Sequence, residues 1–142
     1  MSQLHLKIIT PKKVVLEVDI LQITVPSSSG EITILPRHIR LFTLLQEGVV
    51  KFKTTDDEEY LAIGGGYLET DGDIVELLVT RAYGQDAIDE KKTNEAIEQA
   101  KVSMKAPRDK QHFTESSSLL RKSMIDLKLL KRKAPKTFSK ES

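Results

Sequence analysis

Hydrophobic and polar residues alternate along the first part of the chain, and a helical spacing replaces this alternation in the last part. Leu4, Leu6 and Ile8 are separated by the polar residues His5 and Lys7, which is the period of two that a half-buried β-strand shows. Similar short runs recur up to position 80, with turn residues about every ten positions. The pattern predicts an all-β, antiparallel sandwich of about ten short strands.

The alternation changes phase once, near position 20. Val18 and Ile20 share one face, whereas Leu21, Ile23 and Val25 follow one residue out of step. Because a shift of one residue moves every later side chain to the opposite face, we expect a β-bulge near Ile20–Leu21.

Further strands are expected where short apolar or β-branched runs lie between turn signals, at 31–35, 41–45, 49–53, 60–63 and 74–80. The polar run 54–59 reads as a hairpin loop, and Asp71-Gly72 predicts a tight turn. Gly64-Gly65-Gly66 permits two interpretations. The glycines could form a loop that binds phosphate, or they could lie in a strand where glycine relieves crowding or marks a bulge. The second is favoured because no Lys-Ser/Thr follows the glycines and no βαβ pattern surrounds them.

After Gly84 the composition favours helices. Asp86 is the expected N-cap of a first helix ending at Ala106-Pro107. Its expected packing face contains the following residues: Ala96, Ile97, Ala100 and Met104. Asp109 or Thr114 is expected to cap a second helix. Its expected apolar stripe has these members: Phe113, Ser117, Leu120, Met124, Leu127 and Lys131, widened by Leu119, Ile125, Leu129 and Leu130.

Two helices with a short break predict an antiparallel α-helical hairpin. The expected domains are a β-sandwich at 1–84, the two-helix hairpin at 85–134 and a disordered basic tail at 135–142. A two-helix hairpin has little core of its own, so it must dock elsewhere or fold conditionally.

Composition excludes several classes of function but does not identify the function. The chain has 142 residues, a net charge of +1 and no cysteine. The missing cysteines exclude a disulfide framework, thiolate metal ligation and a cysteine nucleophile. No apolar run approaches the ~20 residues of a membrane span. His38 could be a catalytic or metal-binding residue, but no ligand cluster lies near it in the sequence, so a surface histidine is expected and no metal site is predicted.

The second helix carries a concentration of positive charge. Between positions 119 and 136 there are seven basic residues and a single acidic residue, Asp126. Six of them form the candidate regulatory set: Arg121, Lys122, Lys128, Lys131, Arg132 and Lys133. The run is either a solvated helix face or a surface that attracts an acidic protein. Nucleic acid is disfavoured because Phe113 and Phe138 are the only aromatic residues nearby.

Several short motifs along the chain give it a resemblance to a known family. They are Thr10-Pro11, Gly30-Glu31, Ile34-Leu35-Pro36-x-His38, Gly48-Val49-Val50, Gly65-Gly66-x-Leu68-Glu69 and Ile88-Asp89. Together they resemble the epsilon subunit of the rotary F-type ATP synthase. The chain departs from that family at Thr33 and Arg37, where glycine is usual, and at Ile39-Arg40, where Ala-Pro is usual.

The resemblance implies a non-catalytic rotor subunit that couples proton translocation through the c-ring to ATP synthesis in the catalytic head. The implied partners are the gamma subunit, the c-ring and the alpha/beta head, with membrane contact only through the complex. The implied rotor interface consists of Glu31, Ile34, Leu35, Pro36 and His38. Glu31 would face the c-ring and His38 would face gamma. The helical hairpin is implied to inhibit ATP hydrolysis, its basic helix meeting acidic segments of the beta subunits.

Some family members bind ATP through an Ile/Leu-Asp-x-x-Arg-Ala motif. The matching positions here are Ile88, Asp89, Lys92 and Thr93. Lysine supplies a point charge in place of the planar fork of arginine, so we expect weak or absent regulatory ATP binding and no other cofactor.

Two other function classes stay open at this point. A generic β-sandwich module that binds a ligand or protein and carries a helical tether is the main alternative. An enzyme is disfavoured because no Ser-His-Asp spacing or HExxH motif is present. No transit peptide is visible, so we expect a peripheral protein on the cytoplasmic side of a bacterial cell membrane, with a plastid thylakoid as the alternative.

Overall fold

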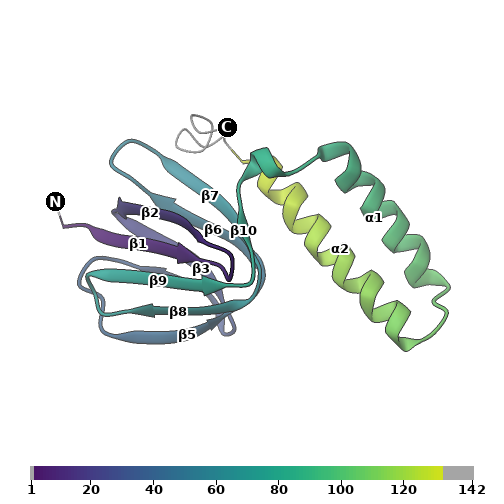
Figure 1. The fold of residues 1–142 in the computed structure, drawn as a ribbon, viewed down its shortest axis with the longest axis horizontal. Coiled ribbons are helices and arrows are strands. Elements are labelled where there is room, and N and C mark those ends of the chain that lie inside the picture. Colours follow the sequence, from purple (N-terminus) through teal and green to yellow (C-terminus); the bar gives the residue numbers. More distant parts are fainter. Residues whose placement is uncertain (1, 133–142) are drawn as a thin grey trace.

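The computed structural model describes residues 2–132, which form a β-sandwich followed by two helices (Figure 1). The strands are β1 (Leu4–Ile9), β2 (Val14–Ile20), β3 (Gln22–Ser27), β4 (Gly30–Ile34), β5 (Leu41–Leu45), β6 (Gly48–Lys53), β7 (Glu58–Ile63), β8 (Gly66–Thr70), β9 (Ile74–Val79) and β10 (Ala82–Tyr83). A 3₁₀ turn, η1 (Gln85–Ala87), leads to α1 (Glu90–Lys105) and α2 (Lys110–Leu130). The predicted architecture is therefore confirmed. The predicted tail at 135–142 lies outside the described residues.

The strands follow the order β10-β7-β6-β3-β5-β8-β9-β1-β2, with β4 paired to β3. The path folds into two layers because β3 and β5 are joined through one residue pair, Ser27 and Leu45. The β1–β9 pair is parallel, and the other strand pairs among the described residues are antiparallel.

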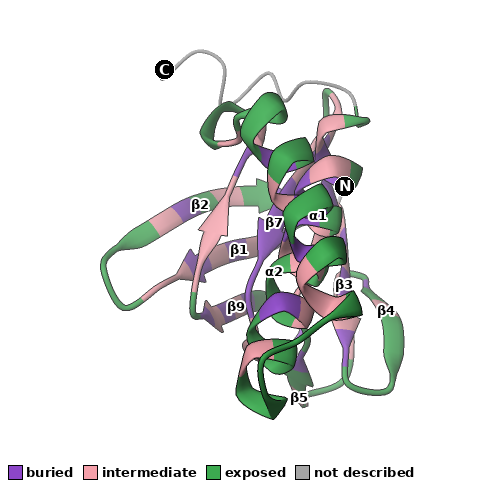
Figure 2. Cartoon of the chain, turned by 90° about the vertical axis from the view of Figure 1, so that its right-hand side faces the viewer, coloured by how far each residue is buried: buried purple, intermediate pink, exposed green. Residues whose placement is uncertain are grey.

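The core lies between the two layers and is fully apolar at its centre. In β1 the burial alternates as the sequence predicted, so Leu4, Leu6 and Ile8 are completely buried. Phe52 of β6 is the largest side chain in this core, and it too is completely buried. Figure 2 shows this buried interior against the largely exposed surface of the helices.

The predicted β-bulge at Ile20–Leu21 is wrong. The phase changes there because β2 ends at Ile20 and β3 begins at Gln22, so the chain passes from one layer to the other. A register shift does occur in β2, where Leu16 pairs with Ile8 but Val14 pairs with Ile9. The alternation alone cannot separate a bulge from a change of strand.

The predicted glycine roles are supported by close backbone approach. A Cβ on Gly66 would lie 2.0 Å from the carbonyl oxygen of Leu78, so only glycine lets β8 approach β9 there. Gly72 has φ +98° in the predicted tight turn. The Asp71 carboxylate accepts hydrogen bonds from the backbone N–H groups of Asp73 and Ile74, both at 2.9 Å, which lowers the pKa of Asp71.

The helices start at aspartates, but not both at the predicted ones. The N-cap of α1 is Asp89, not Asp86, because the chain makes the 3₁₀ turn before the helix begins. The predicted cap Asp109 is confirmed for α2, where its side chain accepts from the backbone N–H of His112 at 2.7 Å. No helix within residues 2–132 is long and apolar enough to cross a membrane.

Candidate functional site

The outer face of the β5-β8-β9-β1-β2 layer carries a continuous row of apolar side chains. Strand register places them directly opposite one another, and we call Leu44, Tyr67, Leu78, Ile9 and Val14 the apolar row. Leu44 is 58% exposed and Val14 is 47% exposed. Their sequence neighbours Leu45, Leu68, Leu77 and Ile8 point into the core, so the row faces outward by the alternation of the strands. An apolar row of this kind is typical of a protein-binding surface.

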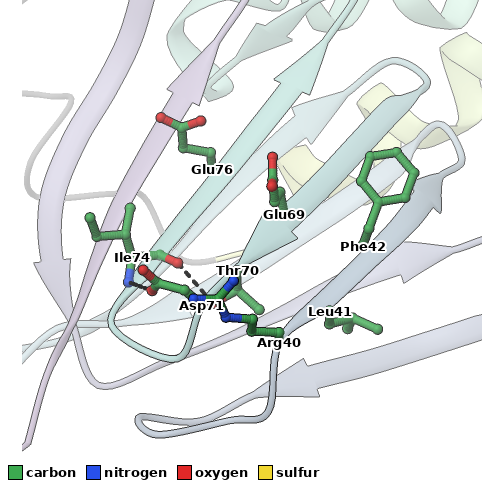
Figure 3. A pocket seen from close by; sticks show the side chains of 8 residues that line it. All are labelled: Arg40, Leu41, Phe42, Glu69, Thr70, Asp71, Ile74 and Glu76. Atoms are coloured by element: carbon green, nitrogen blue, oxygen red, sulfur yellow. Dashed lines mark hydrogen bonds between the residues drawn. The ribbon is translucent and has the colours of Figure 1, made fainter.

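The next outward-facing residues along the same strands form a second row, which is largely charged. Cross-strand pairing runs from Phe42 to Glu69, to Glu76, to Lys7 and to Glu17. Phe42 is 60% exposed, and its ring lies 5.1 Å from that of Tyr67 in the apolar row. A pocket of about 440 Å³ opens beside this row, with Glu69, Glu76 and Ile74 among its walls (Figure 3). The outer face therefore combines exposed aromatic and aliphatic groups with carboxylates.

The implied rotor-interface residues lie at the two ends of β4. Glu31 is exposed at the start of the strand, whereas Leu35, Pro36 and His38 lie in the loop after it. Ile34 is completely buried, so it belongs to the core and does not reach the surface. The structure thus separates the set into two surface regions.

The loop between β4 and β5 is held against the Gly72 turn. Arg37 has φ +66°, a left-handed conformation that favours glycine. Its backbone N–H donates to the carbonyl oxygen of Gly72 at 2.8 Å. This turn leaves Leu35 52% exposed and Ile39 78% exposed. Ile39, which the sequence reading did not include, adds the most exposed large apolar side chain to this loop.

The second helix docks on the sandwich mainly through polar groups, and we call this set of residues the α2 contact. Glu47, Tyr60, Tyr83 and Gln85 lie on one side of it, and Arg121, Asp126, Leu129 and Arg132, from α2 and its C-terminal end, lie on the other. Glu47 accepts from Arg81 of the sandwich at 3.0 Å and from Arg121 of α2 at 3.1 Å. The Gln85 amide donates to the carbonyl oxygens of Leu129 and Arg132 at 2.6 and 2.7 Å. Since the last carbonyls of a helix lack partners within it, Gln85 completes the end of α2.

Asp126 is the buried centre of this contact. It is 6% exposed, accepts a short hydrogen bond from the Tyr83 hydroxyl, and forms an ion pair with Lys122 at 3.2 Å. Burial, followed by the bond to Asp126, raises the pKa of Tyr83 well above its usual value. Lys122 also lies over the Tyr83 ring, 5.4 Å from its centroid. The sequence shows Asp126 as the single acidic residue of the basic run, but it does not show that Tyr83 is its partner.

The basic residues of α2 therefore divide into two groups. Arg121, Lys122 and Arg132 have partners within the subunit, Arg132 lying 5.2 Å from the centroid of the Tyr60 ring. Lys128 and Lys131 form no ion pair within residues 2–132 and border a hollow on the helix. Lys133 lies outside the described residues.

The residues of the nucleotide motif have structural roles at the start of α1. The Asp89 carboxylate accepts from the backbone N–H of Lys92 at 3.0 Å, and the Thr93 hydroxyl donates to the Asp89 carbonyl at 2.8 Å. Thr93 is buried, Lys92 is exposed and Ile88 is half-buried. Within residues 2–132 no cluster of acidic and histidine side chains has the arrangement of a metal site.

Residues 3–85 match the family described as ATP synthase, Delta/Epsilon chain, beta-sandwich domain. The chain is 34% identical over 122 residues to ATP synthase epsilon chain 2 of Syntrophotalea carbinolica, covering 84% of this chain and 88% of that one. It is 33% identical over 129 residues to the ATP synthase epsilon chain of Moorella thermoacetica, covering 90% and 96% of the two chains.

Solved structures share the fold at lower identity. A chain in the mitochondrial ATP synthase of Euglena gracilis, solved with OSCP, F1 and c-ring, superposes with a TM-score of 0.70 at 20% identity, covering 92% of this chain and 78% of that one. A chain in the central stalk and c-ring of the Tetrahymena thermophila mitochondrial enzyme gives 0.56 at 16% identity, covering 89% and 96%. From the family match and the sequence relatives, the chain belongs to the family of ATP synthase epsilon chains.

Proposed function

We propose that this chain is the epsilon subunit of the central stalk of an F-type ATP synthase, and that its sandwich binds the gamma subunit through the apolar row. It takes no part in the chemistry of ATP synthesis, and it reaches the membrane only through the complex. The observation that carries the proposal is the apolar row itself, since Leu44 and Val14 are exposed on a face whose alternate residues fill the core. Phe42 enlarges this surface beside Tyr67.

The ends of β4 supply further contacts. Leu35, Pro36 and His38 lie with the exposed Ile39 in the loop after β4, and this loop supplies a second contact with gamma. Glu31, at the other end of β4, faces the c-ring loops. Two separate ends of one strand suit two separate partners, which supports the division that the resemblance implies. The subunit lies on the cytoplasmic side of a bacterial membrane, as a peripheral part of the complex.

The hairpin is the regulatory part of this proposal. In the described structure α2 lies against the sandwich, and its Arg121, Lys122 and Arg132 are occupied by subunit partners. Release of the α2 contact would free Arg121 and Arg132 for acidic segments of the beta subunits and allow the helices to block hydrolysis, whereas Lys122 keeps its partner Asp126 within the helix. Two states of one element, tipped by partner contacts, are sufficient for such a switch. We expect ATP to bind this hairpin weakly or not at all, because Lys92 stands where the nucleotide motif has arginine.

The interface is tested by measuring the affinity of the full-length chain for purified gamma subunit by biolayer interferometry. Leu44→Glu places a charge in the apolar row and is expected to weaken binding by about a hundredfold, as buried interface anchors do. Val102→Glu on α1 is the matched control, since Val102 is an equally apolar residue that is 67% exposed and away from the sheet. Equal affinity of both variants would reject the proposed face.

A further inference from the structure

Two carboxylates lie directly opposite each other on the outer face of the sandwich, in the second row. Glu69 of β8 pairs in register with Glu76 of β9. Glu69 is exposed, whereas Glu76 is half-buried. Both line the pocket drawn in Figure 3, and Phe42 lines it beside them. Because like charges directly opposite each other on neighbouring strands repel, this pair destabilises the isolated sheet.

The cations of the subunit do not neutralise this pair. No ion pair within residues 2–132 includes either carboxylate. Lys7, the neighbour of Glu76 on β1, is also the neighbour of Glu17 on β2, so the second row has three carboxylates and one ammonium group. Arg40 lines the same pocket but acts on Asp71: backbone N–H groups and, to a smaller extent, the charge of Arg40 lower the pKa of Asp71.

An aromatic ring beside the carboxylates also favours a cation at this position. Phe42 of β5 is opposite Glu69 and is 60% exposed. The face of an aromatic ring attracts a cation, and arginine makes such contacts more often than lysine. A guanidinium group can in addition donate two parallel hydrogen bonds to one carboxylate. A planar cation in this pocket of about 440 Å³ can therefore contact the ring and a carboxylate at once.

We propose that a basic side chain of the gamma subunit, of which arginine fits best, occupies this pocket between Phe42, Glu69 and Glu76. This inference rests on the proposed function and adds the charge of the partner to it. The pocket is continuous with the apolar row, because the ring of Phe42 lies 5.1 Å from that of Tyr67. Gamma thus covers the apolar row with apolar groups and places its cation over the second row. The repulsion between the carboxylates is relieved only in the complex, so the pair fixes how the sandwich is oriented on gamma.

The test removes the two charges and keeps the shapes of the side chains. In the full-length chain, Glu69→Gln combined with Glu76→Gln should weaken binding to purified gamma about tenfold by biolayer interferometry. The loss should shrink at high salt, because screening weakens interactions between charges. The melting temperature of the free double variant should stay the same or rise, since the repulsion is gone. Glu98→Gln is the matched control, an exposed carboxylate on α1, and it should change the affinity less than about twofold.

A second variant tests the ring separately. Phe42→Leu keeps an apolar side chain but removes the aromatic face, and it should weaken binding about threefold. The outcomes also separate this inference from the proposed function. If Leu44→Glu weakens binding but the double glutamine variant does not, gamma covers the apolar row alone and the inference is overturned. Tighter binding by the double variant would overturn it as well, because gamma would then present apolar or acidic groups to the pocket. If Leu44→Glu has no effect, the proposed function itself fails.

Discussion

The sandwich and the helical hairpin are stabilised by different kinds of side chain. The sandwich buries a contiguous apolar cluster that includes Phe52 and Leu68 at 0% exposure. Apart from Ile97, Ala100 and Leu129, the buried residues of the two helices are polar: Thr93, Ser116, Ser123 and Asp126. Apolar burial resists unfolding as a unit, whereas polar contacts can be exchanged for water at small net cost. The two parts therefore differ in kind, the sandwich being held by apolar packing and the hairpin largely by polar contacts.

The largest expected effect comes from the sandwich core. Phe52→Ala removes the largest completely buried side chain and should lower the free energy of unfolding by about 3–5 kcal/mol, through lost transfer energy and the cavity left behind. Urea denaturation followed by circular dichroism measures this. Phe42→Ala is the matched control, because Phe42 is 60% exposed and its loss should change the free energy of unfolding by less than about 0.5 kcal/mol. Similar losses in both variants would remove the distinction between core and surface.

The second effect should be confined to the hairpin. Asp126→Ala leaves the Tyr83 hydroxyl and the Lys122 ammonium without their buried acceptor, at a cost of about 1–3 kcal/mol. The α2 amides should exchange about tenfold faster or more, since 1.4 kcal/mol corresponds to a factor of ten. The sandwich should keep its melting temperature. Hydrogen exchange with mass spectrometry measures both regions at once.

Glu115→Ala is the control for that experiment, since Glu115 is an exposed carboxylate on the same helix whose hydrogen-bond partner is Gln111, also on α2. It should leave α2 exchange unchanged. A simultaneous loss of sandwich stability in Asp126→Ala would show that the two regions unfold together, contrary to the comparison.

The same contrast explains what the sequence could predict. The strands could be predicted because residues such as Leu4, Leu6 and Ile8 alternate with polar residues along one chain segment and all pack into the same core. The docked face of α2 could not be predicted, because Tyr83 and Asp126 are 43 positions apart and nothing in either local pattern pairs them. Periodicity predicted the apolar stripe of α2, but it could not show that Leu129 is buried while Met124 stays 55% exposed.

The interaction surfaces were predictable only in part. The motif could not show that Ile34 points inward while the next residue, Leu35, is 52% exposed. The apolar row was missed because its members come from five strands, and only their register aligns Leu44, Tyr67 and Leu78.

A smaller effect is expected at the start of α1. Asp89→Ala removes the N-cap and should destabilise the hairpin by about 1 kcal/mol, seen as faster exchange in the first turn of α1. Asp86→Ala is the matched control, since Asp86 is exposed in the 3₁₀ turn and caps no helix. Calorimetry with ATP on the wild-type chain sharpens the interpretation: micromolar binding lost in Asp89→Ala would give Asp89 a ligand role beyond capping.

The smallest effect is a pH dependence on the sandwich surface, away from the hairpin. His5 contacts Asp19 at 2.9 Å and Glu17 at 2.8 Å, and these hydrogen bonds raise the pKa of His5 above 6.5. A raised folded-state pKa gives stability that is fully present below pH 6.5 and lost as the pH rises through the folded value. The hydrogen bond from His5 lowers the pKa of Glu17 below 4.5, so the stability that the ionised Glu17 contributes is lost as the pH falls through its folded-state pKa.

The His5 contribution should therefore be greatest between the ordinary pKa values of the two partners, about pH 4.5 to 6.5. Melting temperatures of the wild-type chain and of His5→Gln should differ most there and converge above pH 8, and an NMR titration should show the His5 pKa falling in Asp19→Asn. Because both partners are exposed, the difference should be small. A gap between the two melting curves that widens in alkali would contradict this account. Hairpin exchange should follow none of these changes, because no group of the α2 contact faces His5.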